Sequence, residues 1–171
     1  MLTIRELNST DHDEVRSHLA RSWRETYTKI IGAVQVEEMA ASLDRPDLGM
    51  LAPDGIALVA VENSVGSPST AIGDCLVGTA IAAERHGVGY IWGMYVAPEK
   101  KRCGIGGKLI NEISRLLPSV QQFSVVVLKS SSDADAFYQA LGFSPTATVD
   151  HELSAGKNVP AMTMVWNRIG K

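Results

Sequence analysis

The residues best suited to chemistry lie together in one short, basic, glycine-rich turn. The turn reads Lys100, Lys101, Arg102, Cys103, Gly104, Ile105, Gly106 and Gly107, and an apolar helix pattern follows it. A helix N-terminus presents backbone N–H groups that lack a helical acceptor, together with a partial positive charge. Gly104 and Gly106 would let this backbone approach a phosphate closely, and the lysines and arginine would add charge. The turn therefore predicts an anion site.

A second segment carries an aromatic pair that could serve the same chemistry. Residues 134–143 contain Phe137 and Tyr138, followed by Gly142. The turn and this segment resemble those of the GCN5-related N-acetyltransferases (GNAT), which move an acetyl group from acetyl-CoA to an amine. The family's turn motif is Q/R-x-x-G-x-G/A, and Lys101 holds its first position here in place of Gln or Arg. The resemblance covers nearly the whole chain and implies that the turn binds the CoA pyrophosphate.

Other interpretations of the turn are less consistent with its setting. A lone G-x-G would indicate only the start of a helix, but here a strand precedes it and residues 134–143 follow. A dinucleotide site would require G-x-G-x-x-G, whereas this turn reads G-x-G-G. Gly107 either approaches the phosphates as well or permits close packing of helix and strand. We expect bound CoA to protect Cys103 from thiol reagents; the alternative is a small turn residue without a role.

The resemblance also implies which residues hold the rest of acetyl-CoA. In the family, the strand before the turn splays from the next strand, and its end pairs with the pantetheine arm. The matching residues are Met94, Tyr95 and Val96, and an amide among them could polarise the thioester carbonyl. Ser131 stands where the family often has a pantetheine-binding Asn, and it could equally be a helix cap. The implied cofactor-binding set is Met94, Tyr95, Val96, Lys101, Arg102, Cys103, Gly104, Ile105, Gly106, Gly107, Ser131 and Tyr138.

Amide formation needs a proton donor for the leaving CoA thiolate. Tyr138 matches the tyrosine that acts as general acid in the family; its alternative role is packing at the edge of the core. Phe137 and Leu141 lie at i and i+4 and are predicted to face the core. Tyr138, about 100° further round the helix, would then point into the gap between the strands.

The acceptor amine must also lose a proton, and here the sequence departs from the family. Tyr90 occupies the position where many members have a glutamate. The base could be a water chain, Glu84 or His86 in the preceding turn, or a residue of the first two helices. Trp23 and Tyr27 could contact a cationic acceptor, although their i, i+4 spacing also fits a core stripe.

Composition limits the remaining function classes. The chain has 171 residues, of which 45% are hydrophobic and 20% charged, and this predicts one domain over residues 1–171. A net charge of −3 argues against a nucleic-acid partner. Two cysteines, Cys75 and Cys103, form no disulfide framework, and no spacing suggests a metal site. With no signal peptide or membrane span evident, we expect a cytoplasmic protein without a membrane partner.

Hydrophobic periodicity predicts strands at 2–7, 56–62, 71–83, 88–96, 123–128, 143–149 and 159–166. It predicts helices from 9–11 to about 31, over 34–43, from 104 or 105 to Pro118, and from 131–133 to Gly142. Turns are expected at 63–70 and 84–87. The resemblance implies an α/β fold: a mixed, mostly antiparallel sheet with a V-shaped splay between the fourth and fifth strands and helices on both faces.

The resulting prediction is an acetyl-CoA-dependent N-acetyltransferase that needs no metal. A neutral amine would attack the thioester directly in a ternary complex, without a covalent intermediate. We expect a small-molecule primary amine as acceptor, because no docking domain is evident. A protein or peptide amine is the second possibility, and a non-catalytic CoA-binding module is the third. Family members often dimerise, so a homodimer is a further possibility.

Overall fold

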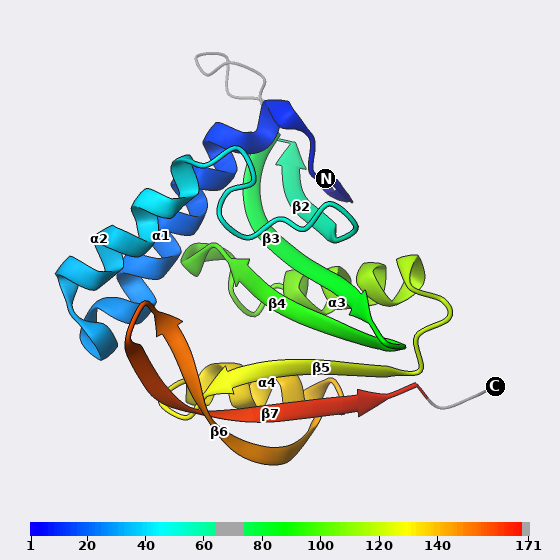
Figure 1. Cartoon of the computed structure of the whole chain (residues 1–171). Helices are drawn as coiled ribbons and strands as arrows, with labels where there is room; N and C mark the ends of the chain where they lie inside the picture. Colours follow the sequence, from blue (N-terminus) through cyan, green and yellow to red (C-terminus); the bar gives the residue numbers. More distant parts are fainter. Residues whose placement is uncertain (64–73, 169–171) are drawn as a thin grey trace. The chain divides into compact units, whose positions relative to one another are not determined.

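The secondary structure follows the predicted order over residues 1–63 and 74–168, the part of the chain that the computed structural model describes (Figure 1). The strands are β1 (Leu2–Glu6), β2 (Ile56–Asn63), β3 (Asp74–Arg85), β4 (Val88–Val96), β5 (Gln122–Leu128), β6 (Ser144–Ser154) and β7 (Lys157–Asn167). The helices are α1 (His12–Ile31), α2 (Ala33–Ala41), α3 (Ile105–Leu116) and α4 (Ser132–Ala140). Short 3-10 turns are η1 (Ser9–Asp11), η2 (Ser42–Asp44) and η3 (Pro98–Lys100).

The strands form a mixed sheet in the order β1-β2-β3-β4-β5-β7-β6. β4 and β5 are parallel, and their register runs from Val88 opposite Gln122 to Ile91 opposite Val125. The pairs β1–β2, β5–β7 and β6–β7 are antiparallel. This sheet confirms the expected fold class. The parallel register stops at Ile91, although β4 continues to Val96.

The chain divides into two compact units. The first consists of Met1–Ile81 and Gly93–Ile113, and the second of Ala82–Trp92 and Ser114–Lys171. In the first unit, α1 and α2 pack side by side (Figure 1). Their apolar stripes and the adjacent strands form one buried cluster, which comprises Val15, Leu19, Trp23, Val36, Leu43, Leu48, Val59, Val61 and Leu76.

Local signals explain where α1 begins and ends. The sequence pattern assigned the start to residues 9–11, and the structure confirms it: Asp11 is the N-cap of α1, and the turn η1 before it is capped by Asn8. Asn8 accepts from Thr10 N–H, while Asp11 accepts from Asn8 N–H at 2.9 Å, so the two side chains cap the first turn reciprocally. The helix ends at Ile31 as predicted, because Gly32 has φ +89°, a conformation that glycine adopts without strain.

The β3–β4 connection is tighter than predicted. Glu84 and Arg85 belong to β3, and the turn is made by His86 (φ +52°) and Gly87 (φ +81°). Two successive residues with positive φ are typical of the two-residue hairpin turns that match strand twist. Histidine is not a usual residue at such a position, so the sequence suggested a four-residue turn. Asn63 ends β2, and the rest of the turn expected at 63–70 lies outside the described residues.

An aromatic cluster forms much of the core of the second unit. Phe123 of β5 stacks on Trp166 of β7, with ring centroids 5.4 Å apart, and Phe143 lies 6.2 Å from the same indole. α4 ends in a Schellman motif: Phe143 N–H donates to Tyr138 O at 3.0 Å, and Gly142 has φ +91°. The predicted stop at Gly142 is therefore confirmed.

Candidate functional site

The glycine-rich turn of the first unit connects η3 to α3. Arg102 (φ +63°) and Gly104 (φ +77°) both adopt left-handed backbone conformations. Lys108 N–H donates to Gly104 O at 3.2 Å, which is the first hydrogen bond of the helix. The N–H groups of residues 105–107 therefore precede the helical ladder and have no acceptor within it. The predicted element, a turn that opens onto a helix N-terminus, is present.

The basic side chains of this turn differ in whether they are exposed or already paired with a carboxylate. Lys101 and Arg102 are exposed. Lys100, in contrast, donates to Glu62 of β2 at 2.5 Å, and this carboxylate raises the pKa of the lysine. Lys100 therefore brings a charge that Glu62 already pairs, and its contribution to the turn stays a prediction. The exposed cations left in the turn are one lysine and one arginine.

Glycine is favoured for different reasons at the positions in and near this turn. A Cβ on Gly104 would have open space, so only its positive φ favours glycine there. Gly106 is buried in the first turn of α3. Sequence reasoning missed Gly78 of β3, where a Cβ would lie 3.3 Å from Ile105 and 3.4 Å from Leu109. Gly78 thus lets α3 approach β3 closely, and the signal for it was an isolated glycine inside a strand.

Three residues of α1 contact Tyr95 near the end of β4. His18 Nε2 lies 3.2 Å from the backbone oxygen of Tyr95. The hydroxyls of Tyr27 and Tyr95 are 3.1 Å apart, and the Trp23 ring meets the Tyr95 ring edge-on, with centroids 6.4 Å apart. α1 therefore contacts both the backbone and the side chain of Tyr95, a residue of the predicted pantetheine strand.

His18 was not among the residues selected from the sequence. Its side chain is only 6% exposed, and this burial lowers its pKa below the usual 6.5. The imidazole is therefore neutral at neutral pH, and donation to the Tyr95 oxygen requires the proton on Nε2. The available signal was its position between Val15 and Leu19 on the apolar stripe of α1. Burial also raises the pKa of Tyr95.

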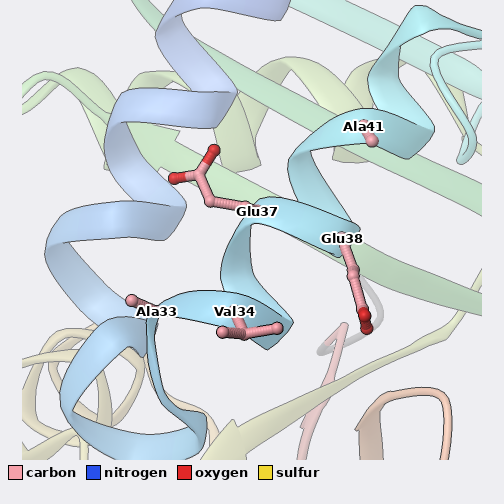
Figure 2. A pocket seen from close by; sticks show the side chains of 5 residues that line it. All are labelled: Ala33, Val34, Glu37, Glu38 and Ala41. Atoms are coloured by element: carbon pink, nitrogen blue, oxygen red, sulfur yellow. The ribbon is translucent and has the colours of Figure 1, made fainter.

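The two predicted acceptor residues differ in exposure. Trp23 is 4% exposed and belongs to the hydrophobic cluster, whereas Tyr27 is partly exposed. A shallow hollow lies along α2 and is lined by Ala33, Val34, Glu37, Glu38 and Ala41 (Figure 2). Glu37 there is held by Arg24 through two hydrogen bonds of 2.7 Å. Contact of Trp23 or Tyr27 with an acceptor stays a prediction.

In the second unit, Tyr138 is a core residue of α4. It is 6% exposed, with Phe137 and Phe143 packed edge-on at centroid distances of 5.0 and 5.2 Å. The expectation that Phe137 and Leu141 face the core while Tyr138 turns away is wrong, since those two are only partly buried. The role of Tyr138 as general acid stays a prediction.

Ser131 and the candidate bases also have defined positions. Ser131 is the N-cap residue of α4, but its hydroxyl makes no capping hydrogen bond. The alternative that Ser131 is a helix cap is confirmed in position, and its backbone oxygen accepts from Asp135 N–H at 3.0 Å. Glu84 is exposed in β3, and His86 and Tyr90 are exposed in and after the hairpin turn. Their roles in proton transfer stay predictions.

Residues 1–63 and 74–168 contain neither a metal-ligand cluster nor a helix suited to a membrane. No group of three or more His, Cys, Asp or Glu side chains in this part of the chain could hold a metal ion. None of its helices combines the length and hydropathy needed to span a bilayer.

Comparisons with known proteins extend the sequence resemblance. Residues 12–143 match the family model "Acetyltransferase (GNAT) family". No curated protein sequence matches the chain. The structure resembles the PaiA N-acetyltransferase of Thermoplasma acidophilum, solved with coenzyme A, at a TM-score of 0.75 and 19% identity, covering 98% of this chain and 99% of that one.

Two further solved structures have similar folds. The ribosomal-protein-S18-alanine N-acetyltransferase of Escherichia coli gives a TM-score of 0.68 at 16% identity, covering 100% of this chain and 97% of that one. Arabidopsis thaliana NAA60, solved with a bisubstrate analogue, gives a TM-score of 0.69 at 17% identity, covering 99% of this chain and 100% of that one. At such identities these likenesses establish the fold, whereas the family model establishes membership.

Proposed function

The chain belongs to the GNAT family of acetyltransferases, and from this premise we propose that it transfers an acetyl group from acetyl-CoA to a primary amine of a small molecule. The observation that carries the donor assignment is the turn before α3. Backbone N–H groups of residues 105–107 precede the helical ladder, and Lys101 and Arg102 stand exposed beside them. This combination of N–H donors, helix dipole and cations suits a pyrophosphate.

In the proposed reaction, a neutral amine attacks the thioester carbonyl of acetyl-CoA in a ternary complex. The new C–N bond forms as the C–S bond breaks, the amine loses a proton to a base or water, and the CoA thiolate gains one. A backbone N–H among Met94, Tyr95 and Val96 would stabilise the oxyanion that develops on the carbonyl. Tyr138 is proposed to supply the proton to the thiolate, whose ordinary pKa of about 8.5 makes that demand modest.

For the acceptor we propose a small-molecule amine, in line with the expectation from the sequence. Structural likeness does not decide the acceptor, because the similar folds include an enzyme named for a ribosomal protein and one named PaiA. A peptide or protein amine therefore serves as the competing outcome of the test.

The donor half of the proposal is tested by calorimetric titration with CoA. The K101A variant should bind CoA about tenfold more weakly, as expected for loss of one charge-assisted phosphate contact. K157A, which removes an exposed lysine at the start of β7, should bind like the wild type. Equal CoA affinity in K101A and the wild type would contradict the assignment of the turn.

The acceptor half is tested by release of CoA thiol from acetyl-CoA with panels of small amines and of peptides with free N-termini or lysines. Acceleration by a small amine supports the proposal, and acceleration by peptides alone would overturn it in favour of a protein acceptor. In Y138F, binding of CoA should persist while the rate with the accepted amine falls at least tenfold. An unchanged rate in Y138F would remove Tyr138 from the mechanism.

A further inference from the structure

Acetyl transfer needs a group that accepts the proton of the attacking amine, and a buried histidine lies beside the strand end proposed to meet acetyl-CoA. His18 of α1 is 6% exposed, and its Nε2 lies 3.2 Å from the backbone oxygen of Tyr95, near the end of β4. Two other candidate bases, Glu84 and His86, belong to the hairpin that leads into β4. Of these three described residues, His18 is the one that hydrogen-bonds to the strand end.

The contact with Tyr95 decides which nitrogen of His18 is basic. A carbonyl oxygen can only accept a hydrogen bond, so Nε2 must carry the proton of the neutral ring, and Nδ1 then holds the free lone pair. Nδ1 makes no hydrogen bond to the described residues. The imidazole is thus oriented through one nitrogen and can accept a proton on the other, which is the arrangement of a base held in place by a third group.

A second buried polar group lies beside this imidazole on α1. Ser22 follows His18 by four residues, so the two side chains share one face of the helix. Ser22 is also 6% exposed, and its hydroxyl has no hydrogen-bond partner among the described residues. Buried polar groups of this kind bond to ordered water when no protein partner is near. A water molecule between Nδ1 and the Ser22 hydroxyl would have two partners, and the N–H of an acceptor amine would be a third.

We propose that His18 is the general base of acetyl transfer and takes the proton of the acceptor nitrogen through one water molecule held by Ser22. As the C–N bond forms and the C–S bond breaks, this water accepts the proton from nitrogen and gives one of its own to Nδ1. The imidazolium returns its extra proton to solvent after the amide leaves. This inference rests on the proposed function and adds to it the base that the sequence left open.

The charges around His18 suit a base that starts neutral and becomes cationic. Burial keeps its pKa below 6.5, and Arg21 acts in the same direction, so the ring is unprotonated at neutral pH. The carboxylates of Glu14 in α1 and Glu99 in η3 favour the imidazolium. Tyr95, whose pKa is raised by burial, stays uncharged. The reaction rate should therefore fall as pH drops through the folded-state pKa of His18.

The variant H18Q separates a base from a structural residue. Its amide nitrogen lies near the place of Nε2 and can still donate to the Tyr95 oxygen, but the amide does not take up a proton near neutral pH. H18A leaves a space for added imidazole or for pyrazole, which has the same size and is a far weaker base. H12Q is the control, because His12 at the start of the same helix is partly exposed and lies outside the proposed site.

The test measures release of CoA thiol with saturating acetyl-CoA and the fastest acceptor from the panels of small amines and peptides. In the wild type and H12Q, the rate should fall on the acid side with a midpoint below pH 6.5. In H18Q, the rate at neutral pH should fall about a hundredfold and the acid limb should disappear, with CoA affinity within about threefold of the wild type. Imidazole should raise the rate of H18A at least tenfold, and pyrazole should not. S22A should lose about fivefold in rate and keep the acid limb.

The outcomes distinguish this inference from the proposed function. If no amine or peptide accelerates thiol release by the wild type, both are overturned. A wild-type rate and acid limb in H18Q would overturn the role of His18 and leave the proposed function intact. A slow H18Q that keeps the acid limb, or an H18A that both azoles or neither restore, would mean that His18 serves packing alone. An S22A variant as fast as the wild type would overturn the water path.

A measurement on the wild type keeps the inference testable if thermal melting shows that H18Q and H18A do not fold. Nitrogen NMR of the labelled imidazole distinguishes a protonated ring nitrogen from one with a free lone pair. At neutral pH, His18 should carry its proton on Nε2 and have an unprotonated Nδ1. A proton on Nδ1 would remove the free lone pair from the proposed site and overturn the inference.

Discussion

Arg102 combines a cationic side chain with a backbone conformation that disfavours it. Its φ of +63° lies in the left-handed region, where a residue with a Cβ costs about 1–2 kcal/mol relative to glycine. The side chain is exposed. The strain of a non-glycine residue at this position is offset if the guanidinium binds a ligand, and we propose that it binds a CoA phosphate.

The R102G variant separates these two effects. It removes the charge and relieves the backbone, so the free energy of unfolding should stay level or rise by up to about 1 kcal/mol, after allowing for the greater freedom of glycine in the unfolded chain. CoA affinity should fall about tenfold. Urea denaturation and calorimetric titration measure the two quantities. Loss of stability together with affinity would mean that the arginine has a structural role.

His18 predicts a pH dependence of stability. Burial, and to a smaller extent Arg21, lowers the pKa of His18 below 6.5, while its bond to Tyr95 and the carboxylates of Glu99 and Glu14 oppose this shift. The unfolded chain therefore binds a proton more readily than the folded chain, and stability falls as pH drops through 6.5 toward the lower folded pKa. H18L should flatten the free energy of unfolding between about pH 7 and 5. An unchanged slope would contradict this assignment.

At the scale of elements, Gly78 controls how closely α3 approaches β3, and α3 carries the proposed phosphate site at its start. G78A would place a methyl group 3.3 Å from Ile105 and 3.4 Å from Leu109, within a packed core. Such overpacking should reduce the free energy of unfolding by about 1–2 kcal/mol. It should also weaken CoA binding, because Ile105 begins the helix whose N–H groups are proposed to hold the phosphates.

A neighbouring variant on the same strand serves as the control for G78A. Thr79 is buried, and its hydroxyl has no hydrogen-bond partner among the described residues. T79V keeps the shape and removes that unsatisfied group, so stability should hold or increase. Urea denaturation of both variants checks the contrast. If the two substitutions destabilised the protein equally, the effect of G78A would reflect a general sensitivity of β3 to substitution. It would then not be evidence for a specific contact with α3.

Elements defined by local signals were predictable, and contacts between elements were not. Gly32 and Gly142 end their helices as the sequence suggested, because a C-terminal glycine acts within its own turn. Pairing of Lys100 with Glu62 and of His18 with Tyr95 joins residues that are distant in sequence. No periodicity specifies such partners, so the pairing of Lys100 was not foreseen and His18 was overlooked.

Tyr138 illustrates the same limit within one helix. The i, i+4 pattern of Phe137 and Leu141 indicated the buried face of α4, yet Tyr138 is the buried member of the three. The Schellman motif at the end of α4 places Phe143 beside Tyr138, and the two rings pack edge-on. This contact buries the side of the helix that carries Tyr138. The motif itself was predictable from Gly142, but the rotation of the helix on its core was not.

At the scale of the whole molecule, binding of the donor should stabilise the folded chain by mass action. A ligand present at a hundredfold excess over its Kd adds about 2.7 kcal/mol if it binds only the folded state. For a chain of 171 residues, this corresponds to a rise in Tm of roughly 5–10 °C. CoA should therefore raise Tm by this amount, and R102G should reduce the rise at equal CoA concentration.

Inorganic pyrophosphate resolves which part of the donor is responsible. If the turn before α3 holds the phosphates, pyrophosphate alone should raise Tm, though less than CoA, because the pantetheine contacts are missing. K157A should reproduce the wild-type shifts with both ligands, since its lysine lies far along the chain in β7. A CoA-induced rise that R102G and K101A leave untouched would place the phosphates elsewhere, and the anion site at the start of α3 would have to be abandoned.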